Sequence, residues 1–182
     1  MVSPMDPTTR ARAFDTIVFG GVTAGALDLF DAFVMSLVNG GTPVRVLHAI
    51  SSGVLGRAAY EGGAPAAALG LALHFVIATC AATTYWLASL KLPILLRRPV
   101  ICGLLFGLAV WALMYQVVLP ITFGRAYMVP ALPQLANQLA IHALGVGLPI
   151  ALIASRSVRI SAASAARSDT PARSVPRIRE SG

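Results

Sequence analysis

Four ionisable side chains lie inside apolar segments of this sequence, where charged groups are rare. Asp28 and Asp31 stand three residues apart in GALDLFDAFVM, and His74 and His142 lie in two later apolar runs. A charged side chain near the centre of a membrane-spanning helix costs about 2.5–3.5 kcal/mol on insertion scales. Such residues therefore indicate either a functional site or polar contacts between helices.

These residue types allow three kinds of chemistry. Hydrogen bonds between helices, each worth about 0.6 kcal/mol, would fix the packing of the bundle, and this structural or accessory role is the interpretation we favour. The same groups could carry protons or cations in a small transporter, which with so few helices would need a homo-oligomer. Alternatively, the histidines could ligate a b-type haem or join the aspartates around a divalent metal.

The sequence predicts neither an enzyme nor a cofactor. The metal- and haem-binding motifs H-E-x-x-H and C-x-x-C-H are absent, so no metal site is predicted. No Gly-rich phosphate loop and no convincing nucleophile-base pair are present either. Ser51, Ser52 and His48 share one segment, where we expect them to be interfacial polar groups.

The composition shows which elements must position the four residues. Of the 182 residues, 57% are hydrophobic and only 12% are charged, and the mean hydropathy is +0.76. These values indicate an integral membrane protein. Continuous runs rich in Ala, Leu and Gly favour helices over barrel strands, so the predicted fold class is all-α and polytopic. Four runs reach the length of about 20 residues that crosses a bilayer: Phe14–Val38, Ala64–Leu90, Val100–Leu119 and Leu135–Ala154.

Lysine and arginine are distributed unevenly between the two ends of these runs. Positive residues that flank spans are retained on the cytoplasmic side. Eleven of the 14 fall at the two termini or in the second connection, and only Arg45, Arg57 and Arg125 fall on the other side. This pattern predicts that both termini are cytoplasmic. The net charge of +7 then reflects sidedness, and no nucleic-acid partner is expected.

The predicted depth of the four polar residues in the bilayer, and their direction around each helix, place them together. With a rise of about 1.5 Å per residue, Asp28 and Asp31 lie roughly 3–8 Å and both histidines about 5 Å outward of the midplane. At about 100° per residue their helix faces are also those with small residues, which mark helix contacts. We therefore predict an intramembrane cluster, with Gln138 and Gln116 as possible supporting residues. The predicted packing glycines are Gly21, Gly25, Gly70, Gly103, Gly107 and Gly145.

Segments outside the spans carry further predictions. Residues 43–60 have apolar side chains at helical spacing and predict an amphipathic helix on the periplasmic surface, with a re-entrant helix as the alternative.

Pro99 should open the third span, Pro120 should close it, and Pro149 should kink the fourth. Cys80 and Cys102 are expected to be buried small hydrophobes rather than a disulfide.

The two ends of the chain differ from its centre. Residues 1–13 are expected to be a cytoplasmic N-terminus, and residues 14–155 a transmembrane domain. A cleaved signal peptide is disfavoured because the first apolar run continues past its only A-x-A pattern. Residues 156–182, rich in Ser, Arg, Ala and Pro, predict a disordered cytoplasmic tail. The partners expected are the lipid bilayer and, through Arg156 and Arg159, its anionic headgroups.

Several stretches together resemble a family of small four-helix bacterial inner-membrane proteins of uncharacterised function. They are GGVTAGALDLFDAF, VLHAISSGVLGRAAYEGG, AALGLALHF and RRPVICGLLFGLAVW followed by VVLP, and they cover roughly residues 14–155. The resemblance implies the four-span topology and a bacterial inner membrane. It implies no active site.

Overall fold

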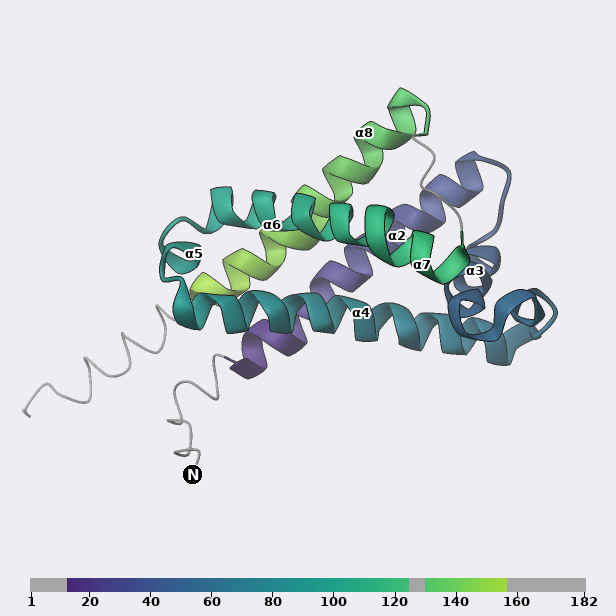
Figure 1. Cartoon of the computed structure of the whole chain (residues 1–182), viewed down its shortest axis with the longest axis horizontal. Coiled ribbons are helices and arrows are strands. Elements are labelled where there is room, and N and C mark those ends of the chain that lie inside the picture. Colours follow the sequence, from purple (N-terminus) through teal and green to yellow (C-terminus); the bar gives the residue numbers. More distant parts are fainter. Residues whose placement is uncertain (1–12, 125–129, 157–182) are drawn as a thin grey trace, which may run out of the picture.

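The computed structural model describes residues 13–124 and 130–156, and every regular element within those ranges is a helix (Figure 1). Four helices are long and apolar enough to cross a membrane: Asp15–Val38, Gly63–Lys91, Pro99–Phe123 and Leu132–Arg156. The predicted all-α fold with four hydrophobic helices is therefore confirmed at that level. The predicted N-terminal segment and the basic tail with Arg159 lie outside the described residues, except for residue 13 and Arg156.

Shorter elements make up or connect the long helices. The first long helix consists of η1 (Asp15–Gly20) and α2 (Gly21–Val38), and the second is α4 (Gly63–Lys91); between them lie α3 (Pro43–Leu55) and η2 (Gly56–Tyr60). After α5 (Ile94–Arg97), the third consists of α6 (Pro99–Leu113), η3 (Met114–Val118) and α7 (Leu119–Phe123). The fourth consists of α8 (Leu132–Ala140), η4 (Ile141–Gly147) and residues 148–156.

The third long helix does not end at Pro120, as the sequence suggested, but continues to Phe123. A proline lacks an N–H, and its ring collides with the carbonyl four residues earlier, here that of Gln116. The wider π-helical turn of η3 lies directly before this position and accommodates the ring. The helix then ends at Gly124, whose φ of +62° is left-handed. A second π-helical segment, η4, precedes Pro149 in the same way.

Glycines allow close packing at three helix contacts. Gly21 and Gly25 of α2 face Thr79, Phe75 and Ala78 of α4. Gly103 and Gly107 of α6 lie against the backbone of the fourth helix, where a Cβ on Gly107 would overlap the carbonyl oxygen of His142. Gly145 is buried close to Leu27. Gly70 also packs closely against a helix, but its neighbour is the backbone of Leu47 in the short helix α3.

The helix α3 forms because Thr42 and Pro43 define its start. The Thr42 hydroxyl accepts a hydrogen bond from the Arg45 N–H, and proline is favoured in the first turn. The imidazole of His48 is buried and its Nε2 lies 2.9 Å from the Gly63 carbonyl oxygen. Ser51 is also buried. The expectation that these two are interfacial polar groups is therefore wrong, because α3 turns them toward the start of α4.

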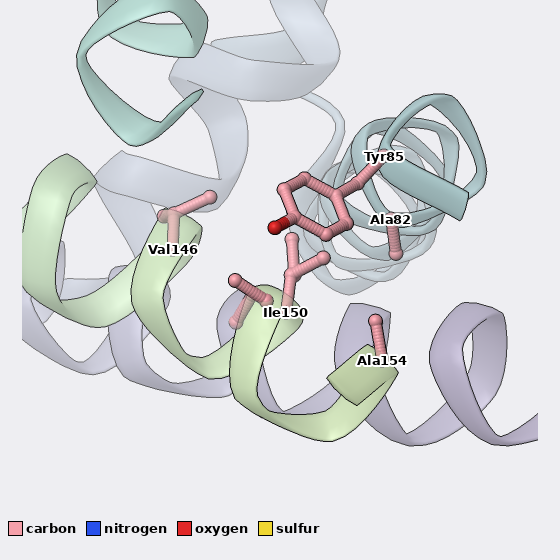
Figure 2. Packing of buried hydrophobic residues seen from close by; sticks show 7 residues of the cluster. Ala82, Tyr85, Val146, Ile150 and Ala154 are labelled. Atoms are coloured by element: carbon pink, nitrogen blue, oxygen red, sulfur yellow. The ribbon is translucent and has the colours of Figure 1, made fainter. Parts of the chain in front are cut away.

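The hydrophobic core lies toward the α5 end of the bundle, whereas α3 lies at the opposite end of α4 (Figure 1). Figure 2 shows Tyr85 of α4 against Val146, Ile150 and Ala154 of the fourth helix. The Tyr85 hydroxyl donates to the Leu95 carbonyl at 2.9 Å, so its polar end is satisfied. The core closes this end of the bundle.

The two cysteines are free thiols, but they are less buried than predicted. Cys80 is exposed on the outside of the bundle, and Cys102 is half-buried with its Sγ 3.7 Å from the Ile94 carbonyl. Cys80 differs from the expectation because its direction on α4 points away from α2 and toward the apolar surface, where a small thiol is as acceptable as in a core.

Candidate functional site

A cavity of about 600 Å³ lies between the helices on the α3 side of the core. Its wall includes Asp28, Asp31, His74 and His142, so all four polar residues singled out in the sequence border one space. Three long helices contribute these residues, and α3, η3 and α7 complete the wall. Ala24 and Val146 belong both to the wall and to the core, so the cavity ends against the core.

Asp31 is hydrogen-bonded to the fourth helix. The Asn137 side-chain amide donates a hydrogen bond of 2.8 Å to Asp31 Oδ2, which joins α8 to α2. A carboxylate that accepts such a bond inside an apolar bundle recovers part of the free energy lost when it leaves water. This side chain thus fastens two helices together.

His74 is hydrogen-bonded to the first helix. Its Nε2 lies 2.9 Å from the Gly25 carbonyl oxygen. A carbonyl only accepts hydrogen bonds, so Nε2 must carry the proton. The contact is possible because Gly25 has no side chain and α4 approaches it closely. His74 therefore joins α4 to α2, six residues before the position at which Asp31 joins α2 to α8.

Asp28 forms no hydrogen bond to another helix among the described residues. Its carboxylate accepts no hydrogen bond from any described residue, and its Oδ2 lies 4.0 Å from His74 Nε2, beyond hydrogen-bonding distance. The side chain is 26% exposed, and that exposure is toward the cavity. His142, His74 and Asp31 are all close enough to interact with it electrostatically. Asp28 is thus a half-buried carboxyl group that shares the cavity wall with two histidines and a second carboxyl group.

Among the described residues, His142 forms a hydrogen bond only within its own helix. Its Nδ1 lies 2.8 Å from the Gln138 carbonyl oxygen, so the proton of the neutral ring is on Nδ1 and Nε2 is an acceptor. The ring is 7% exposed and makes an edge contact with Tyr115, with ring centroids 5.8 Å apart. It lies in the π-helical segment η4, and such segments occur frequently at functional sites.

The amides around the cavity differ from those predicted. Gln138 lines the cavity, and its Oε1 accepts from Trp111 Nε1 at 3.4 Å. Gln116 is exposed and does not line it, because the π-helical turn η3 shifts the direction of residues along the third helix. Three further amides of the wall, Asn39, Gln134 and Asn137, were not predicted from the sequence. The Oε1 of Gln134 is buried without a donor among the described residues.

The four-residue spacing of polar side chains could have predicted one of these wall residues, Gln134. Gln134 and Gln138 are four residues apart, as are Gln138 and His142, so the three share one face of a helix. Gln134 was overlooked because the span was started at Leu135, whereas the helix begins at Leu132.

The arrangement of the four residues does not favour a metal centre. Within residues 13–124 and 130–156, no three His, Cys, Asp or Glu side chains are placed so that they could share an ion. The proposal of a divalent metal held by the aspartates and histidines together is therefore not supported by this geometry.

Comparisons with protein-family models, with curated proteins and with solved structures find no match for this chain.

Proposed function

We propose that this chain is a bacterial inner-membrane protein that binds a small molecule in the cavity between its helices. The observation that carries the proposal is that Asp28 and His142 present unbonded polar atoms to a cavity of about 600 Å³. Binding sites for small molecules are mostly apolar cavities of this size with a few convergent polar groups. Four apolar helices and the bias of positive residues support the membrane and the cytoplasmic placement of both termini.

In this orientation α3 lies on the periplasmic surface, and the cavity lies in the periplasmic half of the bundle. Exposed apolar residues such as Val44, Val54 and Leu55 on α3 support an interfacial position. Arg156, exposed at the end of the fourth helix, would contact anionic headgroups on the cytoplasmic side.

A purely structural role accounts for only half of the cluster. Asp31 and His74 make hydrogen bonds between helices, as polar packing requires. Asp28 makes none with the described residues, and the hydrogen bond of His142 stays within its own helix. A carboxylate kept in an apolar bundle without a bonding partner costs stability, which is the usual sign of a residue retained for function.

Thermal unfolding in detergent separates these two roles. We expect Asp28→Asn to melt at the same temperature as the wild type or higher, because no hydrogen bond is lost and an acid is removed from an apolar site. Asp31→Ala and His74→Ala should each lose about 1–3 kcal/mol, because each leaves a polar group unbonded inside the bundle, the partly buried Asn137 amide or the Gly25 carbonyl. A loss for Asp28→Asn as large as that for Asp31→Ala would assign Asp28 to packing and remove the proposed site.

Proton-linked transport is a second candidate, favoured because Asp28 lies 4.0 Å from His74 Nε2 and shares the cavity wall with His142. Because the cavity ends against the core, a complete pathway would require movement of the helices, in a homo-oligomer of this small bundle. Protein in liposomes should then carry a proton flux that Asp28→Asn abolishes. A wild-type protein without flux would leave ligand binding as the function.

A further inference from the structure

The cavity wall has two carboxyl groups, those of Asp28 and Asp31, and no lysine or arginine among its described residues. Its other ionisable groups are the imidazoles of His74 and His142 and the phenol of Tyr115. A carboxylate in an apolar site is stabilised by a positive charge in direct contact. The electrostatic complement of the two carboxylates is therefore a cation.

Several free hydrogen-bonding positions of the wall are acceptors. Both Asp28 oxygens and His142 Nε2 have no donor among the described residues. Neither His74 Nε2 nor the Asn137 amide donates to Asp28, since they bond to Gly25 and Asp31 instead. A ligand that carries several N–H groups would satisfy these acceptors. A hydroxyl-bearing ligand supplies only one donor per oxygen, and a carboxylate supplies none.

The rest of the wall is apolar. On the side away from the core, α3 contributes Val46, Ile50 and Val54, and the third helix contributes Leu119 and Phe123. A hydrated inorganic ion would leave this surface uncovered, and the described residues offer no three-ligand metal site. An apolar group attached to the cationic head would bury this surface.

We propose that the cavity binds an organic cation, a protonated amine with an apolar body. Its ammonium group lies between Asp28 and His142, and its apolar body lies toward α3. The inference rests on the proposed binding function and assigns the class of ligand to that site.

Three probes of nearly equal shape and different charge test the inference. They are 1-naphthylmethylamine, 1-naphthylmethanol and 1-naphthylacetic acid, titrated calorimetrically into the full chain in phosphatidylcholine nanodiscs. A zwitterionic lipid is used because anionic headgroups would attract the amine by themselves. We expect the amine to bind the wild type at least tenfold more tightly than the alcohol, and the acid not to bind. In Asp28→Asn the amine should bind less than threefold more tightly than the alcohol.

Asp15→Asn is the matched control, because it makes the same change on the first helix outside the cavity wall. It should keep the tenfold preference. Equal binding of amine and alcohol to the wild type would overturn the cation proposal and leave the cavity as a binding site for neutral molecules. Binding of none of the three probes would overturn both proposals. The comparison on the wild type alone decides between these outcomes, even if Asp28→Asn does not fold.

Discussion

Asn137 donates a 2.8 Å hydrogen bond to Asp31 across the contact between α8 and α2. These residues are 106 positions apart in the chain, so their contact reports directly on the packing of the first helix against the fourth. The pair offers a measurement of how much one polar contact contributes to this bundle.

A double-mutant cycle with Asp31→Ala and Asn137→Ala should give a coupling free energy of about 0.6–1.7 kcal/mol, the range found for hydrogen bonds between membrane helices. Unfolding in mixed detergent micelles measures it. Asp15→Ala combined with Asn137→Ala is the control cycle and should give a coupling near zero. A coupling near zero for Asp31 with Asn137 as well would mean that the bond contributes nothing to stability.

Gly107→Ala should destabilise the protein by about 1–3 kcal/mol, because the added methyl group would overlap the His142 carbonyl and separate α6 from the fourth helix. Gly20→Ala is the matched control. Its Cβ would find its nearest neighbours at 3.7 Å, an ordinary contact, so this variant should keep the wild-type stability or gain up to about 1 kcal/mol from helix propensity. Equal effects in the two variants would contradict the packing described for α6.

His48→Ala should loosen α3 from α4, because the Gly63 carbonyl loses its 2.9 Å partner and a buried side chain is removed. We expect a loss of about 1–3 kcal/mol and faster hydrogen exchange that is confined to α3. Ser52→Ala serves as the control, since its hydroxyl bonds only to Ala49 within the same helix. If exchange in α3 is unchanged by His48→Ala, the histidine does not hold this helix.

The proposed orientation predicts which connections can be labelled in intact cells. In a background in which Cys80 and Cys102 are replaced by alanine, a membrane-impermeant maleimide should label Glu61→Cys from outside. Lys91→Cys should react only after the inner membrane is permeabilised. Both positions are exposed, so accessibility to the reagent depends on the side of the membrane alone. The reverse pattern would invert the topology and place the cavity in the cytoplasmic half.

Hydropathy was sufficient to predict the four long helices, because each must cover about 30 Å of hydrocarbon with apolar side chains. That the Asp and His residues border one space agrees with the prediction from the helical rise. Their bonding partners did not follow, since the bond between Asn137 and Asp31 depends on the relative rotation and offset of two helices that are distant in the chain. Likewise, nothing in the sequence indicated that Gly70 packs on α3.

Direction around a helix was predicted correctly for His74 and His142 but not for Gln116. Counting at about 100° per residue was appropriate for α4, and His74 lies on the cavity wall. The same count failed for Gln116, because the π-helical turn of η3 holds more residues than an α-helical turn. Proline at position 120 was the available signal, but it was interpreted as a helix end.

The π-helical segment Ile141–Gly147 also bears on how the fourth helix tolerates a change of length. A wide turn is equivalent to an α-helix with one residue inserted, so deleting a single residue such as Ala143 would regularise the backbone locally. In a regular α-helix a deletion rotates everything after it by about 100°, whereas here the wide turn has already absorbed the extra residue. Ile150 and Ala154 would therefore stay in the core beside Tyr85 while Asn137 kept its contact with Asp31. The fourth helix can thus lose one residue at this point, and the half that lines the cavity stays in phase with the half that forms the core.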